Sequence, residues 1–130
     1  MTVNQSGRYY VSVTTLVLKS WLYAPKFFYY TSKAFKSAEQ ASGNISSIGT
    51  SYKGAHMTIT VWENKEAMLK FFRGEAHAAA MKITKDISSY SKMCGYFTDE
   101  MPSHEDAIKV WKRDGRRVHG DADPLYGDKI

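Results

Sequence analysis

Polar and apolar residues alternate along the first clear segment of the chain, from Tyr9 to Leu18. Because successive side chains of a strand point to opposite faces, the segment presents two sets. One set is Tyr9, Val11, Val13, Thr15 and Val17, and the other is Tyr10, Ser12, Thr14, Leu16 and Leu18. Its β-branched and aromatic content predicts a strand. Both sets contain apolar side chains, so we expect this strand to be covered on both faces.

A second alternating segment runs from His56 to Trp62 and predicts another strand. Asn64 follows it, and its side-chain oxygen suits the free N–H groups at the start of a helix. Met68, Phe71 and Phe72 then recur at helical spacing up to a break at Gly74. After that break a second helical stripe is formed by Ala76, Ala79, Ala80, Ile83 and Ile87.

The remaining segments of the domain predict one more helix and two more strands. Pro25 opens a predicted helix that runs to about Ser42, and Gly43 ends it. Its inward stripe is Phe27, Thr31, Ala34, Phe35 and Ala38. A weaker strand over 45–52 leads through a two-residue turn at 53–54 into the strand ending at Trp62, and 91–97 forms the fourth strand. The order strand, helix, strand, strand, helix, strand predicts an α+β fold, the ferredoxin-like βαββαβ arrangement with a four-stranded antiparallel sheet.

The pattern changes beyond Pro102. Ser103 caps a predicted short amphipathic helix that ends near Asp114, with Ala107, Ile108 and Trp111 on its apolar side. Residues 116–130 are polar and without periodicity, which predicts a tail. We therefore divide the chain into a flexible N-terminus (1–8), one domain (9–98) and a C-terminal extension with a short helix and a polar tail (99–130).

Composition fits one globular domain, since 43% of the 130 residues are hydrophobic. No apolar run approaches the length of about 18 residues that a membrane-spanning helix needs. The polar residues 1–8 do not resemble a secretory signal, so we expect the cytoplasm. The lone Cys94 fits a small buried hydrophobe. Net charge is +5, and residues 1–54 carry six basic side chains and one acidic side chain. No nucleic-acid-binding motif accompanies this charge, so we expect no nucleic-acid partner.

The segment from Trp62 to Met81, W-E-N-K-E-A-M-x-x-F-x-x-x-x-x-H-x-x-A-M, resembles the dimeric α+β barrel superfamily. Within it, the chain looks like the antibiotic-biosynthesis-monooxygenase-like proteins and is most similar to the spheroidene-monooxygenase-like branch and related uncharacterised bacterial proteins. Lys19-Ser20-Trp21 at the end of a strand, followed by Pro25, fits the same branch, and the likeness covers roughly residues 9–97.

The resemblance implies a homodimer, with two sheets paired face to face across a twofold axis. We expect this pairing also because the sheet face away from the helices would otherwise be wet. The resemblance further implies a small-molecule cavity between the sheet and the helices. Its candidate lining residues are Trp21, Tyr23, Phe27, Tyr30, Trp62, Phe71, His77 and Met81. His77 is the candidate catalytic residue, because a neutral imidazole can exchange a proton near pH 7.

The haem-degrading members of the superfamily give a contrast. Aligned without gaps from Trp62, their functional Trp falls at Phe71 and their iron-ligating His falls at Met81. We therefore expect no cofactor, although haem binding through His77 stays open. Two functions remain: a monooxygenase-like enzyme that acts on a hydrophobic or aromatic small molecule, or a non-catalytic dimeric module that binds a small apolar ligand, haem or a partner chain.

Overall fold

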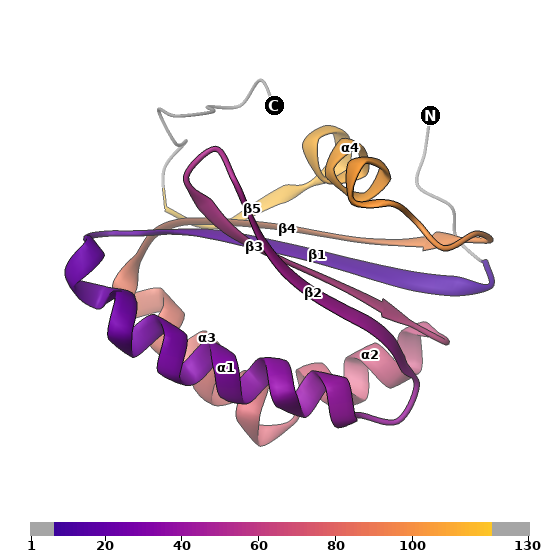
Figure 1. Cartoon of the computed structure of the whole chain (residues 1–130), viewed down its shortest axis with the longest axis horizontal. Helices are drawn as coiled ribbons and strands as arrows, with labels where there is room; N and C mark the ends of the chain where they lie inside the picture. The colour runs from indigo at the N-terminus through magenta and orange to yellow at the C-terminus, as the bar shows by residue number, and fades with distance from the viewer. Residues whose placement is uncertain (1–6, 121–130) are drawn as a thin grey trace.

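An antiparallel five-stranded sheet lies at the centre of the structure, a computed structural model that describes residues 7–120 (Figure 1). Its strands in chain order are β1 (Tyr9–Leu18), β2 (Asn44–Tyr52), β3 (Ala55–Trp62), β4 (Ser88–Thr98) and β5 (Arg116–Gly120). Their order across the sheet is β2-β3-β1-β4-β5, and every neighbouring pair is antiparallel. The first four strands have the expected ferredoxin-like order.

Helices cover both faces of this sheet (Figure 1). The short helix η1 (Trp21–Tyr23) leads into α1 (Ala24–Gln40), and α2 (Lys65–Phe72) is followed directly by α3 (Glu75–Ile87). These helices form a layer on one face, whereas α4 (His104–Asp114) lies on the other. No helix of the described residues is long and apolar enough to cross a bilayer.

Local sequence signals explain where the elements begin and end. The Asn64 side chain accepts a hydrogen bond from the Ala67 backbone N–H at 2.8 Å, which caps α2. Gly43 ends the turn after α1 with φ of +89°, and a Cβ there would overlap the Ala67 side chain. Lys53 and Gly54 both have positive φ, at 48° and 84°, as a two-residue hairpin turn requires.

The main hydrophobic core lies between the sheet and α4. Val11 and Val13 of β1 are 0% exposed and pack with Met57, Ile59 and Val61 of β3. Ala107 and Trp111 of α4 pack against these strand residues and complete the core. The argument that this sheet face would stay wet without a partner subunit is therefore wrong, because α4 of the same chain buries it. The dimer itself stays a prediction.

The prediction of four strands and of a tail from Arg116 is also wrong. Residues 116–120 form β5, which pairs with β4 through contacts such as Met93↔Arg116 and Lys92↔Arg117. An edge strand is held by backbone hydrogen bonds on one side and needs no apolar alternation, so the sequence pattern did not indicate it. The predictions made for residues 1–6 and 121–130 fall outside the described part of the chain.

Candidate functional site

The sheet face that meets α1, α2 and α3 differs in character from the core face. Its centre is made of small or polar side chains: Ser12 of β1 lies beside Thr60 of β3, and Thr14 lies beside Thr58. On the other side of β1, Ser12 is paired with Gly95 of β4. Ser12 is only partly buried, although its neighbour Val11 is fully buried. Small side chains leave space between the sheet and the helices, where large ones would fill it.

A cavity of about 430 Å³ occupies part of this space. The helix α2 supplies one wall through side chains three, four and seven residues apart, and β1 and β4 supply the floor. Its lining residues are Tyr10, Ser12, Lys65, Met68, Leu69, Phe72, Met93, Cys94, Gly95, Asp114 and Arg116. Mostly apolar walls with a few polar groups are typical of a small-molecule site.

Tyr10 provides the buried polar group of this cavity. Its ring is 7% exposed and meets Phe97 edge to face, with ring centroids 4.9 Å apart. Its hydroxyl lies over Gly95, where any added Cβ would overlap it. Burial raises the pKa of Tyr10, and repulsion between its phenolate and the thiolate that Cys94 forms at high pH adds to this effect. The hydroxyl is therefore protonated at neutral pH and can donate a hydrogen bond to a ligand.

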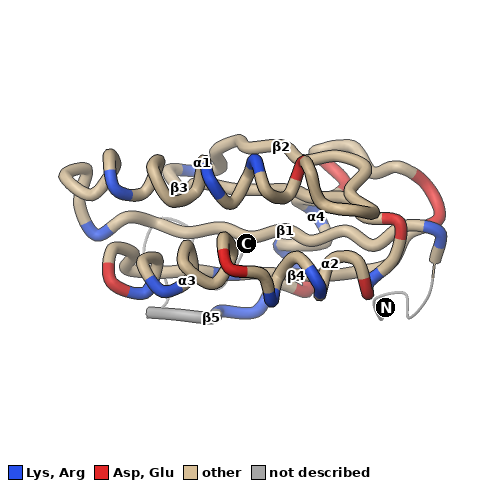
Figure 2. The backbone as a smooth tube through the Cα atoms, turned by 90° about the horizontal axis from the view of Figure 1, so that it is seen from below, with Lys and Arg blue, Asp and Glu red and all other residues tan. Residues whose placement is uncertain are grey.

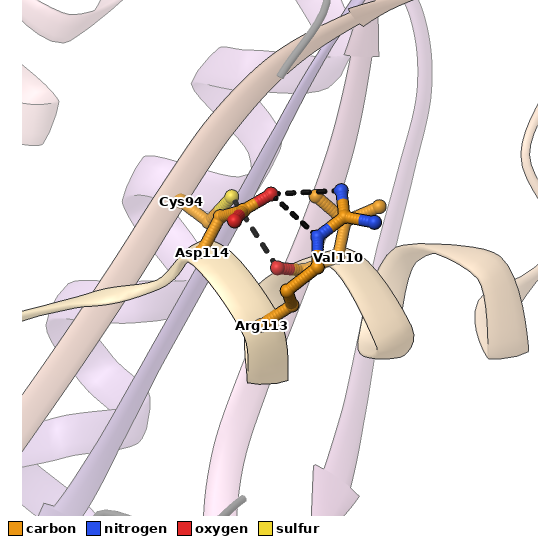
Figure 3. Close-up of polar contacts among 4 residues, drawn as sticks. All are labelled: Cys94, Val110, Arg113 and Asp114. Carbon is orange, nitrogen blue, oxygen red and sulfur yellow. Dashed lines mark hydrogen bonds and ion pairs between the residues drawn. The ribbon is translucent and has the colours of Figure 1, made fainter. Parts of the chain in front are cut away.

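Two cationic side chains also line the cavity. Lys65 at the start of α2 places its Nζ 5.8 Å from the Tyr10 ring centroid. Arg116 opens β5 and is exposed at the cavity wall. Asp114 carries the opposite charge, but its Oδ2 is held by Arg113, with an ion pair of 2.8 Å to the guanidinium (Figure 3). A ligand in the cavity therefore meets a local excess of positive charge.

His77 lies next to the cavity and does not line it. Its imidazole contacts Phe71 and Phe72, at centroid distances of 5.2 and 4.4 Å, and Phe72 in turn forms part of the cavity wall. Nδ1 of His77 is buried without a hydrogen-bond partner among the described residues. Burial lowers the pKa of His77, and the backbone of Phe72 opposes this shift in part. The imidazole is therefore neutral at pH 7.

Of the candidate lining residues, the structure brings Trp62, Phe71 and His77 into contact with one another, away from the cavity lining. Trp62 stacks on Phe71 with centroids 5.4 Å apart, and Phe71 meets His77 edge to face. Trp62 is fully buried, and its Nε1–H donates to the Thr60 hydroxyl at 2.9 Å. Trp62 and Phe71 thus belong to a small core cluster, and Met81 on α3 is partly buried.

The other predicted residues lie around the start of α1 and do not line the cavity. Trp21 is 80% exposed and Tyr23 is 38% exposed. Phe27 is buried against His56, with ring centroids 4.5 Å apart, and Tyr30 meets Tyr29 edge to face. The structure therefore separates these four residues from the group around His77.

Cys94 fits the structural role expected of it. Its Sγ lies 4.0 Å from the Val110 carbonyl oxygen at the last turns of α4 (Figure 3). Burial, assisted by the charge of Asp114, raises the pKa of the Cys94 thiol to about 11. A thiol that stays protonated at neutral pH is a poor nucleophile.

The residues present do not fit a haem ligated through His77. An axial ligand must face the space that holds the porphyrin, whereas His77 does not line the cavity and its ring packs against Phe72 with centroids 4.4 Å apart. In the described part of the chain, no three His, Cys, Asp or Glu side chains are grouped to hold a metal ion.

Sequence reasoning missed Tyr10, Ser12, Lys65, Met93 and Gly95 as cavity residues. The alternation in β1 did place Tyr10, Ser12 and Thr14 on one face. The sequence did carry one signal for the cavity. Small polar residues lie at the middle of the strand face that meets the helices, and such side chains cannot fill the space between the sheet and the helices.

Comparison with known proteins supports this geometry at the level of the fold. SnoaB from Streptomyces nogalater, described as a cofactor-independent oxygenase, matches with a TM-score of 0.61 and 9% sequence identity. The match covers 73% of this chain and 97% of that one. The chain has the fold of the antibiotic-biosynthesis monooxygenases.

Two further solved structures match the chain with similar TM-scores. One antibiotic biosynthesis monooxygenase has a TM-score of 0.62 at 8% identity and covers 72% of this chain and 99% of its own. A proposed enzyme of the same type from Deinococcus radiodurans has a TM-score of 0.64 at 17% identity and covers 72% and 96%. No family model and no curated protein sequence matches the chain. The expected fold of the dimeric α+β barrel superfamily is thus confirmed, while membership of the spheroidene-monooxygenase-like branch stays a prediction.

Proposed function

We propose that this protein is an oxygenase that acts, without a prosthetic group, on a hydrophobic or aromatic small molecule bound between the sheet and α2. The observation that carries the proposal is the cavity in which a protonated Tyr10 and the cation Lys65 meet apolar walls. The description of SnoaB, which shares the fold, as a cofactor-independent oxygenase supports the absence of a prosthetic group.

The chemistry of such a site follows from its charges. Without a redox cofactor, the electrons that reduce O₂ come from the substrate, so the substrate reacts as an electron-rich anion such as an enolate or phenolate. The substrate supplies all four electrons: its reacting carbon loses two hydrogens and becomes a carbonyl with one oxygen atom of O₂, and the other oxygen atom leaves with those two hydrogens as water. Lys65 and Arg116 would stabilise the anion, and the Tyr10 hydroxyl would donate a hydrogen bond to its oxygen. His77 is the candidate proton acceptor, through movement of Phe72.

Oxygen uptake by the purified protein tests this proposal, with quinols, polyenes and aromatic polyketides as substrates. We expect protein-dependent uptake with an acidic aromatic substrate, and at least about a tenfold loss of kcat/KM in Tyr10→Phe and in Lys65→Met. Lys70→Met is the matched control, since Lys70 is an exposed lysine on the same helix. No uptake with any substrate, or an equal loss in all three variants, would overturn the proposal.

A non-catalytic binding module is the second candidate. The observation in its favour is that, among residues 7–120, no imidazole or unpaired carboxylate lines the cavity, so none of these residues offers a general base in direct reach. Ligand binding that is weakened by Tyr10→Phe, but is not accompanied by oxygen uptake, would establish this function. A Soret band in the purified protein would instead indicate haem.

The proposal includes a homodimer, as the resemblance implies, and a cytoplasmic location. In each subunit, α4 already covers the core face of the sheet. In a face-to-face barrel, this face would therefore contact both α4 of its own chain and the sheet of the partner subunit. Light scattering decides the point, since a monodisperse monomer at micromolar concentration would exclude the dimer.

A further inference from the structure

An exposed group of aromatic and aliphatic side chains surrounds the start of α1. Of the seven large hydrophobic side chains exposed in the described part of the chain, five fall between Trp21 and Tyr29. They are Trp21, Leu22, Tyr23, Phe28 and Tyr29, and the first two are 80% and 68% exposed. Single exposed apolar residues are normal on a protein surface, whereas a contiguous group indicates a binding surface.

Lysine side chains accompany this group on the outer face of α1. Lys26, Tyr29, Lys33 and Lys36 follow one another at intervals of three, four and three residues, which keeps them on one side of the helix. The buried Phe27 and Ala38 mark the opposite side. Lys33 Nζ lies 4.5 Å from the Tyr29 ring centroid, so cation and aromatic ring are in direct contact.

Few acidic side chains balance these lysines. Glu39, near the end of α1, is the one acidic residue within residues 1–54. The backbone view from the helix side shows α1 marked mainly by basic residues (Figure 2). The surface formed by Trp21, Leu22, Tyr23, Tyr29, Lys19, Lys26, Lys33 and Lys36 is called the aromatic-lysine face below. Phe28 is left out of it, because its ring meets His56 of β3, with centroids 5.5 Å apart.

We propose that the aromatic-lysine face binds the protein peripherally to an anionic lipid bilayer. Tryptophan, tyrosine and leucine side chains insert into the boundary between head groups and acyl chains, while lysines beside them pair with anionic head groups. The helix α1 belongs to the outer helical layer of the fold (Figure 1), and a fluid bilayer surface needs no preformed pocket on the protein. The opposite charges of the lysines and the lipid are complementary.

Intrinsic fluorescence gives a selective test of this proposal. Of the three tryptophans of the chain, Trp62 and Trp111 are 0% exposed, so a change of emission on adding vesicles reports on Trp21. The full chain is titrated with phosphatidylcholine vesicles that contain or lack phosphatidylglycerol, and bound protein is measured by co-sedimentation. We expect a shift of the emission to shorter wavelength and co-sedimentation with the anionic vesicles, both weakened by salt.

Matched variants separate the apolar from the electrostatic contribution. Combining Trp21→Ser with Leu22→Ser should lower partitioning into anionic vesicles by about tenfold or more, as followed by co-sedimentation. Combining Lys26→Glu with Lys33→Glu should lower it by a similar factor and remove the preference for anionic lipid. Ile45→Ser and Met101→Ser replace exposed apolar side chains elsewhere and should bind as the wild type does.

Three results would overturn the proposal. The first is no binding to either vesicle composition. The second is binding that the two double variants leave unchanged. The third is a homodimer that the Trp21 and Leu22 substitutions convert to a monomer while vesicles never bind, because the aromatic-lysine face would then be a contact between two copies of the chain. None of these results depends on oxygenase activity.

Discussion

Trp111 of α4 and Lys92 of β4 fix the C-terminal helix to the sheet through two contacts. The Trp111 Nε1–H donates to the Lys92 carbonyl oxygen at 3.3 Å, and Lys92 Nζ lies 4.5 Å from the centroid of the indole ring. Both side chains are buried. The helix that sequence analysis assigned to an extension of the domain is therefore part of its main core.

Replacing Trp111 by Ala should lower the free energy of unfolding by about 3–5 kcal/mol, because the substitution empties the centre of this core. Trp111→Phe should cost less, since it keeps most of the packing and loses the hydrogen bond. Urea unfolding measures both, with the exposed Met101→Ala as a control. A Trp111→Ala protein within about 1 kcal/mol of the wild type would show that α4 is dispensable.

Ending the chain after Gly115 should lower the melting temperature by several degrees, because it removes β5 and leaves the edge of β4 unpaired. A chain that ends after Gly120 keeps β5 and serves as the control. Thermal unfolding of the two chains gives the comparison. Equal melting temperatures would mean that β5 adds nothing to the stability of the sheet.

Most of the fold could be predicted because its signals are local. The Asn64 cap, the Gly43 stop and the turn at Lys53 and Gly54 each depend on neighbouring residues, and all three are present in the structure. The position of α4 could not be predicted in this way. An amphipathic helix shows which of its sides is apolar, and it does not show which sheet face that side will meet.

The lining of the cavity could not be predicted, since none of the eight predicted residues belongs to it. Trp62, Phe71 and His77 carry a strong apolar pattern and do converge, yet that pattern indicates packing. A cavity arises where side chains are small, as at Ser12 and Gly95, and such residues leave no hydrophobic signal. Lys65 is an exposed residue of α2, and only the fold shows that it lies beside Tyr10.

Gly95→Ala should lower ligand affinity strongly, because the added Cβ overlaps the Tyr10 hydroxyl and must displace the Tyr10 ring. We expect a loss of stability of about 1–3 kcal/mol as well. Gly49→Ala on β2 is the matched control, since a Cβ there meets nothing nearer than the Phe35 ring at 4.0 Å. Calorimetric ligand titration measures the affinity. Unchanged affinity in Gly95→Ala would place the ligand elsewhere.

The Cys94 thiol should resist modification by a disulfide reagent at neutral pH until the protein unfolds, because it is buried and protonated. Its pKa is raised from 9.0 to about 11, so the fold favours the neutral thiol. The resulting stabilisation is complete below pH 9 and is lost as pH rises toward 11. Urea midpoints across this window should fall less steeply in Cys94→Ala. Rapid labelling of the native protein would contradict this picture.

His77 should make the protein sensitive to acid. Because burial lowers its pKa below the ordinary 6.5, folding favours the neutral imidazole, and this stabilisation is present above pH 6.5 and is lost as pH falls. His77→Gln should therefore lose less stability than the wild type between about pH 7.5 and about pH 5, as measured by urea midpoints. The exposed His104→Gln is measured beside it as the control variant. If His77 also accepts a proton from substrate, His77→Ala removes turnover while costing little stability. A loss of several kcal/mol with ligand binding intact would instead assign it a structural role between Phe71 and Phe72.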